Sequence, residues 1–316
     1  MFEHDTVPEV DLAHELLVIR VLHFSDVHVQ ESVFAVPALE MVGKRALAVA
    51  NLWLTRGRLF KESVPKLHAL ARFARAEQVD FAICTGDYTA IGSEAEYVSA
   101  RAAIEGLTRA PLGFCTVPGN HDLYLGDTLR DTRFERHFGA FTESDWPESA
   151  VPGAPYPYVR LVGESLAVVG INSSKPNPSP FTSAGFIPPA QLAALARVLD
   201  DARLVGRRVI VITHYGILRR DGRPDSEHHG LLNADALVAV CARPHVMIAH
   251  GHIHGRYCHP PVEGRPWIFC AGSTTQRERE GLWVYEFEAS RMLAIPGNYY
   301  GGEYMLARSE ALEVVL

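Results

Sequence analysis

Short polar motifs stand directly after apolar runs at five places in this chain. Their side chains are carboxylates, imidazoles and an amide, which bind divalent first-row metal ions and also act as acids and bases. In chain order the motifs are Asp26-x-His28, Gly86-Asp87, Gly119-Asn120-His121-Asp122, His214 and Gly251-His252-x-His254. Each motif alone is also typical of an ordinary turn. Their repeated occurrence after apolar runs predicts a shared metal site instead.

The apolar runs are nearly continuous in aliphatic and aromatic residues, which predicts strands buried on both faces. The expected strands cover residues 17–24, 81–85, 114–117, 166–171, 209–213, 246–249, 267–270 and 282–287. Ligands in open α/β sheets gather at the carboxyl ends of strands, so the motifs can meet there. We expect Asp26 and His28, and likewise His252 and His254, to project from one side of an extended backbone. The motif glycines are expected to permit close turns near the metals.

Helices are predicted in several of the gaps between strands. Ser93 followed by Glu96 forms a capping box that opens a helix to about residue 107. Pro189 suits the first position of a second helix, and Asn233 is expected to cap a third over residues 234–242. Strands alternating with helices indicate an α/β layered protein. Residues 1–316 are therefore predicted to form a single domain.

The ordered set of motifs resembles the calcineurin-like metallophosphoesterase superfamily, in particular its cyclic-nucleotide phosphodiesterase-like branch. The resemblance covers residues 26–254, and no motif is missing. It implies a four-layer α/β/β/α sandwich of two mixed sheets flanked by helices, with a dinuclear metal centre at one edge. It also implies two ligand sets that share a bridging Asp87: Asp26, His28, Asp87 and His254 for one metal, and Asp87, Asn120, His214 and His252 for the other.

The chemistry of paired metal ions agrees with this resemblance. Two ions can clamp a phosphoryl group and lower the pKa of a shared water, so that a metal-bridging hydroxide attacks phosphorus. His121 is expected to act in catalysis without binding metal, by stabilising charge or protonating the leaving group. Asp122 is expected either to orient His121 or a ligand histidine, or to cap the following backbone turn. Mn²⁺ or iron suits the mixed nitrogen and oxygen donors, and Zn²⁺ is the alternative.

The bulk composition is that of a globular protein with ample material for a core: 316 residues, of which 47% are hydrophobic and 21% charged. The formal net charge is -7 and the basic residues are scattered, which argues against a nucleic-acid partner. An acidic protein with an anionic substrate needs local positive charge, which metal ions supply. The five cysteines form no CxxC pair and are expected to be reduced, and the acidic N-terminus is not a signal peptide. These features predict a cytoplasmic protein.

The leading functional prediction is a phosphodiesterase that acts on a small, nucleotide-type phosphoester. A protein phosphatase is disfavoured because Asp87 is followed by Tyr88-Thr89-Ala90 and not by x-x-Asp-Arg-Gly. A lipid pyrophosphohydrolase of the UDP-diacylglucosamine type uses the same metal motifs and is the main alternative. A non-catalytic scaffold is disfavoured because such a protein would have lost metal ligands, and none is lost here.

The segment Met41–Phe60 is the candidate entry region for a lipid-linked substrate. Apolar residues fall on one face at helical spacing, with basic residues around its margins: Val42, Ala46, Val49, Ala50, Trp53 and Leu54 are apolar, and Lys44, Arg45, Arg56 and Arg58 are basic. This pattern predicts either a lid or peripheral membrane contact, or an ordinary helix packed on the sheet, which we favour. Burial of Trp53 against the sheet would indicate the ordinary helix.

Several other polar residues near the motifs carry weaker predictions. His23 lies inside the first strand and is expected to pack in the core. Tyr88 and Tyr124 each closely follow a metal motif, and we expect one of the two to serve packing and the other to contact substrate. His228 and His229 lie in the loop over residues 219–230, which is expected to be solvated rather than to line the pocket.

Overall fold

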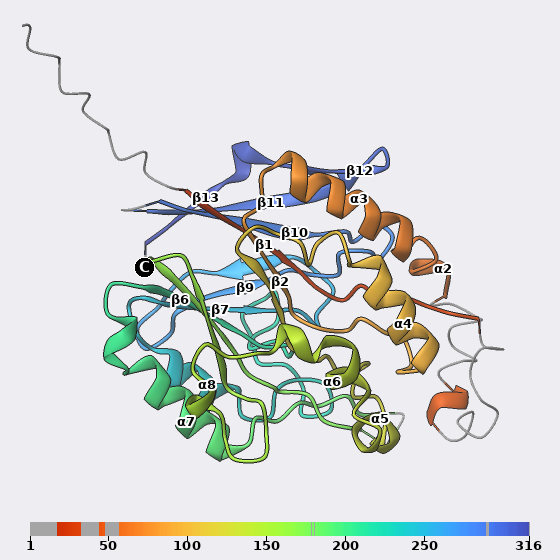
Figure 1. Ribbon diagram of the computed structural model, residues 1–316, viewed down its shortest axis with the longest axis horizontal. Coiled ribbons are helices and arrows are strands. Elements are labelled where there is room, and N and C mark those ends of the chain that lie inside the picture. The colour runs from red at the N-terminus through yellow and green to blue at the C-terminus, as the bar shows by residue number, and fades with distance from the viewer. Residues whose placement is uncertain are drawn as a thin grey trace, which may run out of the picture.

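The computed structural model describes residues 18–32, 44–47, 57–177, 179, 181–288 and 291–315. Two mixed β-sheets stack on one another between layers of helices (Figure 1). The first sheet has the order β12-β11-β10-β1-β2-β3, with β13 paired to β11. Its strands are β1 (Ile19–Phe24), β2 (Phe81–Cys84), β3 (Gly113–Thr116), β10 (Leu282–Phe287), β11 (Met292–Tyr300), β12 (Glu303–Leu306) and β13 (Leu312–Val314).

The second sheet has the order β4-β5-β6-β7-β9-β8. Its strands are β4 (Tyr158–Val162), β5 (Leu166–Gly170), β6 (Arg208–Ile212), β7 (Val246–His250), β8 (Tyr257–His259) and β9 (Trp267–Cys270). Strands β1, β2 and β3 run parallel to one another, as do β5, β6, β7 and β9. Their carboxyl ends therefore point the same way within each sheet.

The strands are apolar throughout because both faces of each sheet are covered. Side chains alternate along β1: Val21 packs toward the second sheet, whereas Leu22 packs toward the helices on the outer face. The layer between the sheets also buries Ile83 from β2 and Met247 from β7. This arrangement confirms the expected four-layer α/β/β/α sandwich.

Helices form the two outer layers. On the first sheet, Leu67 of α3 and Tyr97 of α4 belong to the buried cluster on the outer face. On the second sheet, Leu195 of α7 and Leu237 of α8 do the same. The helices are α2 (Gly57–Leu59), α3 (Ser63–Ala76), α4 (Glu94–Ala103), α5 (Gly126–Arg130), α6 (Arg133–Phe138), α7 (Pro189–Leu199) and α8 (Ala234–Cys241). Single 3₁₀ turns occur at η4 (Gly139–Phe141), η5 (Pro147–Ser149), η6 (Ala202–Leu204) and η7 (Arg308–Glu310).

The predicted helix starts are largely confirmed. Ser93 Oγ accepts from the Glu96 backbone N–H at 3.3 Å, and Glu96 Oε2 accepts from the Ser93 N–H at 3.1 Å, which completes the capping box. Helix α7 begins at Pro189 as expected. Asn233 occupies the N-cap position of α8 as expected, but its side chain makes two bonds to the backbone of Ile187 and none to α8. No helix within the described ranges is long and apolar enough to cross a bilayer.

Candidate metal centre and active site

The loops that follow β1, β2 and β3 meet the loops that follow β6 and β7 at one edge of the sandwich. The His252 backbone N–H donates to Asp26 Oδ2 at 2.9 Å. His214 Nδ1 lies 2.8 Å from the carbonyl oxygen of Thr85, the residue after β2. The two sheets thus contribute candidate ligands to a common site, and the motifs converge in space as expected.

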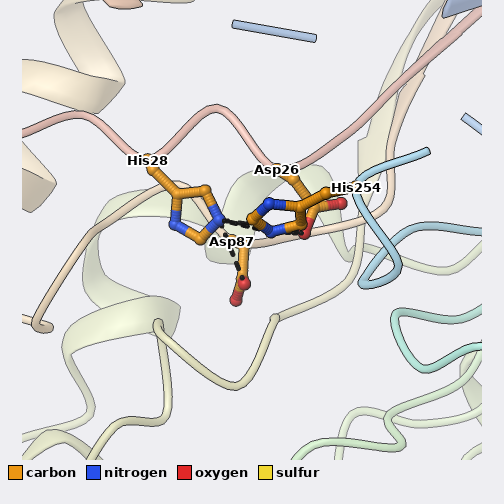
Figure 2. A group of neighbouring side chains, drawn as sticks. All are labelled: Asp26, His28, Asp87 and His254. Carbon is orange, nitrogen blue, oxygen red and sulfur yellow. Dashed lines mark hydrogen bonds and ion pairs between the residues drawn. The ribbon is translucent and has the colours of Figure 1, made fainter. Parts of the chain in front are cut away.

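A first group of potential ligands consists of Asp26, His28, Asp87 and His254, whose donor atoms all lie within 4.8 Å of one another (Figure 2). His28 Nε2 lies 3.1 Å from His254 Nε2 and 3.6 Å from Asp87 Oδ2. His254 Nε2 lies 3.3 Å from Asp26 Oδ1. The group has enough donor atoms, and these lie close enough together, to hold one divalent ion.

A second group lies on the other side of Asp87 and consists of Asn120, His214 and His252. Asn120 Oδ1 lies 3.0 Å from His214 Nε2 and 3.0 Å from His252 Nδ1. His214 Nε2 lies 3.6 Å from Asp87 Oδ1. The two carboxylate oxygens of Asp87 therefore face different groups, as a bridging ligand requires.

Hydrogen bonds fix which ring nitrogen of each histidine faces the site. Three of the candidate ligand histidines place Nδ1 on an acceptor oxygen: His28 on Thr89 O at 3.1 Å, His214 on Thr85 O at 2.8 Å and His254 on Gln276 Oε1 at 2.5 Å. A carbonyl oxygen cannot donate, so each Nδ1 carries the proton and each Nε2 presents a lone pair to the site. Metal-binding histidines typically use their second nitrogen in this way.

The acceptor atoms of the site fit a bound cation. His28 Nε2 and His254 Nε2 are 3.1 Å apart, and both present lone pairs. Asp26 Oδ1 is buried and accepts no hydrogen bond within the described part of the chain. Burial lowers the pKa of His214 and of His252, which keeps these rings neutral. Acceptors that face one another away from water are unfavourable unless a cation lies between them. The donor set therefore suits divalent metal ions.

Five of the seven candidate ligand residues adopt the left-handed backbone conformation. The φ angles are 52° at Asp26, 42° at His28, 60° at Asp87, 69° at His252 and 56° at His254. The extended backbone expected for Asp26 and His28, and for His252 and His254, was therefore wrong, because all four residues have left-handed φ angles. Such angles are unfavourable for residues other than glycine and are characteristic of functional sites. Bonds between loops hold them here: the Asp26 N–H donates to Gly86 O at 3.0 Å and the His28 N–H to Asp87 O at 3.0 Å.

Two glycines allow the loops to approach this closely. A Cβ added to Gly119 would lie 2.1 Å from Asp87 Oδ1, and one added to Gly251 would lie 2.0 Å from Ser25 Oγ. Both distances are far below van der Waals contact. The predicted role of these glycines in close turns beside the ligands is confirmed.

His121 lies beside the first ligand group but bonds elsewhere. Its Nδ1 is 2.5 Å from Ala90 O, and its ring packs edge-on against His28 with centroids 4.9 Å apart. Because Nδ1 carries the proton, Nε2 is the nitrogen with a lone pair in the neutral ring. His121 also lines the cavity described below. Its location is consistent with acid or base chemistry on a molecule bound there, which stays a prediction.

Asp122 is fully buried, and its carboxylate binds backbone amides. Oδ2 accepts from Asp87 N at 2.9 Å and Gly119 N at 2.8 Å, and Oδ1 accepts from Tyr88 N at 2.9 Å and Thr89 N at 3.1 Å. Burial raises the pKa of this carboxyl to about 6, and the amides oppose that rise. These contacts favour the turn-capping interpretation of Asp122, which thereby joins the loops carrying Asp87 and Asn120.

The tyrosines near the motifs divide between core and cavity. Tyr88 is buried, stacks on Phe138 with centroids 4.0 Å apart and donates to Thr116 Oγ1 at 2.7 Å, so it serves packing. Tyr124 lines the cavity and stacks on His121 with centroids 5.4 Å apart. His23 packs in the core as expected, with Nδ1 2.9 Å from the Tyr285 hydroxyl.

A cavity of about 1030 Å³ opens beside the ligands. Its wall includes Asp87, Asn120, His121, His252 and His254 from the motifs, and Ala90, Ile91, Tyr124, Phe181, Thr182, Ser183, Arg219, Ser226, Ile253, Gln276 and Arg279 from other segments. His228 and His229 also line it, although both are exposed. The loop is therefore solvated, as expected, and these two histidines line the pocket as well. The His229 carbonyl lies 3.0 Å from His252 Nε2 and so fixes a ligand ring.

Both described stretches of the segment over residues 41–60 contribute to the cavity wall. Lys44, Leu47, Leu59 and Phe60 all line the cavity. Burial of Trp53 would distinguish a lid from an ordinary helix, but Trp53 lies outside the described residues. The choice between the two therefore stays a prediction.

Gln276 is a site residue that the sequence motifs do not include. It bonds His254 from the loop after β9, at a position that no spacing rule connects to the histidine pair.

Comparisons with known proteins place the chain among phosphoesterases. The family profile described as calcineurin-like phosphoesterase matches residues 19–256. No curated protein matches the sequence. Among solved structures, a dimetal phosphatase from Danio rerio superposes with a TM-score of 0.64 at 14% identity, covering 94% of this chain and 98% of that one.

A purple acid phosphatase from yellow lupin (Lupinus luteus) seeds superposes with a TM-score of 0.57 at 12% identity. The match covers 95% of this chain and 54% of the plant protein. Structural likenesses at this level of sequence identity support the fold. The match to the family profile supports membership of the family.

Proposed function

We propose that this chain, which belongs to the calcineurin-like phosphoesterase family, cleaves phosphodiester bonds in nucleotide-type substrates with two metal ions. It is a phosphoester hydrolase with a small phosphorylated substrate, and the nucleotide class is the proposed refinement. The observation that carries the dinuclear centre is the position of Asp87. Its Oδ2 lies 3.6 Å from His28 Nε2 in one donor group, and its Oδ1 lies 3.6 Å from His214 Nε2 in the other.

Asp26, His28, Asp87 and His254 would hold one metal ion, and Asp87, Asn120, His214 and His252 the other. Two such ions polarise phosphoryl oxygens and lower the pKa of bound water, and Mn²⁺ or iron suits these donors. The chain's own contribution is to fix the donor atoms before substrate arrives. His121 then faces the cavity with Nε2, which would give a proton to the leaving oxygen, or stabilise developing charge, when the ring is in its imidazolium form.

The size and lining of the cavity support a nucleotide. A volume of about 1030 Å³ is at the upper end for sites that bind small molecules. Phe181 lines it with an exposed ring and provides an aromatic surface of the kind on which bases stack.

A lipid-linked pyrophosphate is the second candidate, because apolar side chains are exposed at the cavity. Leu47 is 60% exposed and Phe181 is 88% exposed, and both line it. An amphiphilic substrate, or peripheral contact with a membrane, would cover such side chains. This observation favours the lipid pyrophosphohydrolase over a scaffold function.

A hydrolysis screen with added Mn²⁺ tests the proposal. Cyclic nucleotides, nucleotide pyrophosphates and a UDP-linked lipid should be compared by kcat/KM. We expect the highest value for a soluble nucleotide diester, whereas preference for the UDP-linked lipid would replace the leading assignment by the second. Metal analysis after Mn²⁺ loading should approach two ions per chain. Saturation at one ion would contradict the dinuclear centre, and Asp87→Ala should lose both.

The cytoplasmic location is also part of this proposal. The five cysteines are free thiols, and all but Cys258 are buried, as expected in a reducing compartment. Fractionation of cells that produce the protein, followed by immunodetection, would test it, and recovery outside the cytoplasmic fraction would contradict it.

A further inference from the structure

Lys44 lies on the same wall of the cavity as the predicted catalytic histidine. Its Nζ is 4.8 Å from the centroid of the Tyr124 ring. Tyr124 in turn stacks on His121, and His121 packs against the metal-ligand candidate His28. A continuous row of side chains therefore leads from the first ligand group to the Lys44 ammonium, which lines the cavity.

The Lys44 ammonium is held by neutral groups. It donates to Asn177 O at 2.7 Å and to Thr182 O at 3.5 Å. Lys175 reaches the same residue, with Nζ 3.2 Å from Asn177 Oδ1. Neither lysine has a carboxylate partner within 4.0 Å in the ranges that the structure describes. Two ammonium groups thus converge on one asparagine with no counter-charge from those ranges.

The electrostatic consequence appears in the pKa of Lys44. Partial burial, and then the nearby charge of Lys175, lower it to about 8. A bound anion would relieve both effects, because it would neutralise the local charge and replace the lost hydration.

The rest of the cavity wall adds to this positive charge. Arg219 and Arg279 line it and are exposed. Apart from the ligand Asp87, the lining carboxylate is Asp225, which already pairs with His229 at 2.6 Å. In a chain with a formal net charge of -7, this local excess of cations suits a substrate with more than one anionic group.

The position of Lys44 is fixed by the next residue. Arg45 is 1% exposed and binds both oxygens of Asp127, at 2.8 and 3.2 Å. Arg45 Nε also donates to Ile91 O at 3.2 Å, and Ile91 itself lines the cavity. A buried bidentate pair of this kind is geometrically specific. Lys44 is therefore anchored at the cavity and differs from an ordinary surface lysine.

We propose that Lys44 binds a second anionic group of the substrate, separate from the phosphoryl group that is cleaved. The substrate class would be nucleotides that carry at least one further phosphate, and Lys44 would select for them. This inference rests on the proposed function for the identity of the main site. The interaction itself concerns binding and can be measured without turnover.

Calorimetric titration of the Mn²⁺-loaded protein tests the inference. The ligands are adenosine 5′-monophosphate, adenosine 5′-diphosphate and adenosine 3′,5′-bisphosphate, which place a second phosphate at two different positions. The wild type should bind at least one two-phosphate ligand more tightly than the monophosphate. Lys44→Gln should weaken that ligand about tenfold or more, the usual effect of losing a charged hydrogen bond, and leave the monophosphate nearly unchanged. Lys44→Arg should retain most of the preference.

Lys61→Gln is the matched control, because Lys61 is exposed and removal of its charge should affect all three ligands equally. Equal weakening of every ligand by Lys44→Gln, or no weakening at all, would overturn the inference. Thermal unfolding of each variant shows whether the fold is retained, and Lys44→Arg decides the case if Lys44→Gln is unstable. Absence of hydrolysis in the substrate screen would contradict the proposed function alone, since the titrations do not depend on turnover.

Discussion

Replacement of Asp122 by asparagine separates the two roles considered for this residue. The carboxylate accepts four backbone N–H groups, two on each oxygen, from Asp87, Tyr88, Thr89 and Gly119. Asparagine has the same shape but carries an NH₂ group in place of one oxygen. In Asp122→Asn that group must face two N–H donors, so two hydrogen bonds are lost whichever way the amide turns.

The magnitude follows from those two bonds. A hydrogen bond to a charged group contributes about 1.5–3 kcal/mol, so the loss amounts to roughly 3–6 kcal/mol before any gain. Removing a buried charge offsets part of this, and we expect a net destabilisation of about 3 kcal/mol. Out of a typical free energy of unfolding of about 5–15 kcal/mol, this is a large share. It should lower Tm by roughly 5–10 °C.

The functional assay is metal content alongside kcat. Asp122 joins the loop of Asp87 to the loop of Asn120, so Asp122→Asn should bind less Mn²⁺ after loading and dialysis. The control is Asp235→Asn at an exposed position of α8, which should change neither metal content nor Tm appreciably. Full metal content and an unchanged Tm, combined with a low kcat, would refute this reasoning and indicate that Asp122 acts through His121.

Three further substitutions test other parts of the site and core. His121→Ala should lower kcat by roughly 10²–10⁴-fold at unchanged metal content, and activity within a few-fold of wild type would remove His121 from the mechanism. Gly119→Ala should abolish metal binding, because its Cβ would lie 2.1 Å from Asp87 Oδ1, and normal metal content would contradict that clash. Burial lowers the pKa of His23 to about 3, so below pH 6.5 only the unfolded chain gains this proton. Between pH 7.5 and pH 5, the free energy of unfolding of the wild type should therefore fall by about 2 kcal/mol more than that of His23→Gln. Urea unfolding in the presence of a chelator measures both values, and equal losses would disprove this prediction.

Much of the fold could be predicted because its signals are local. Unbroken runs of apolar residues identified the strands at the centres of both sheets. Such runs arise because neighbouring residues, for example Val21 and Leu22, are buried on opposite faces of one strand. The capping box at Ser93 is complete within four residues, so the sequence alone contains it. The strands β4, β8, β11, β12 and β13 were not predicted. In β11, Pro296 and Gly297 interrupt the pattern that apolar continuity relies on.

The details that escaped prediction depend on partners far along the chain. The Asn233 side chain bonds Ile187, which is 46 residues away, and so does not bond its own helix. The left-handed turn at Asp26 is held by Gly86 from the neighbouring strand's loop. Gln276 reaches His254 from a loop without any motif. Ligand types could therefore be predicted from residue chemistry, whereas the backbone turns and supporting bonds are consequences of tertiary structure.

The division of the ligands between the two sheets has a consequence for folding order. Asp26, Asp87 and Asn120 follow strands of the first sheet, whereas His214 and His252 follow strands of the second. Closing contacts between residues so distant in sequence costs chain entropy that only the packed sheets can offset. The complete ligand set can assemble only after both sheets have formed and docked. Each proposed ligand group includes side chains from both sheets, so binding of either metal ion would report that the whole sandwich, and not merely one half of it, has reached its native arrangement.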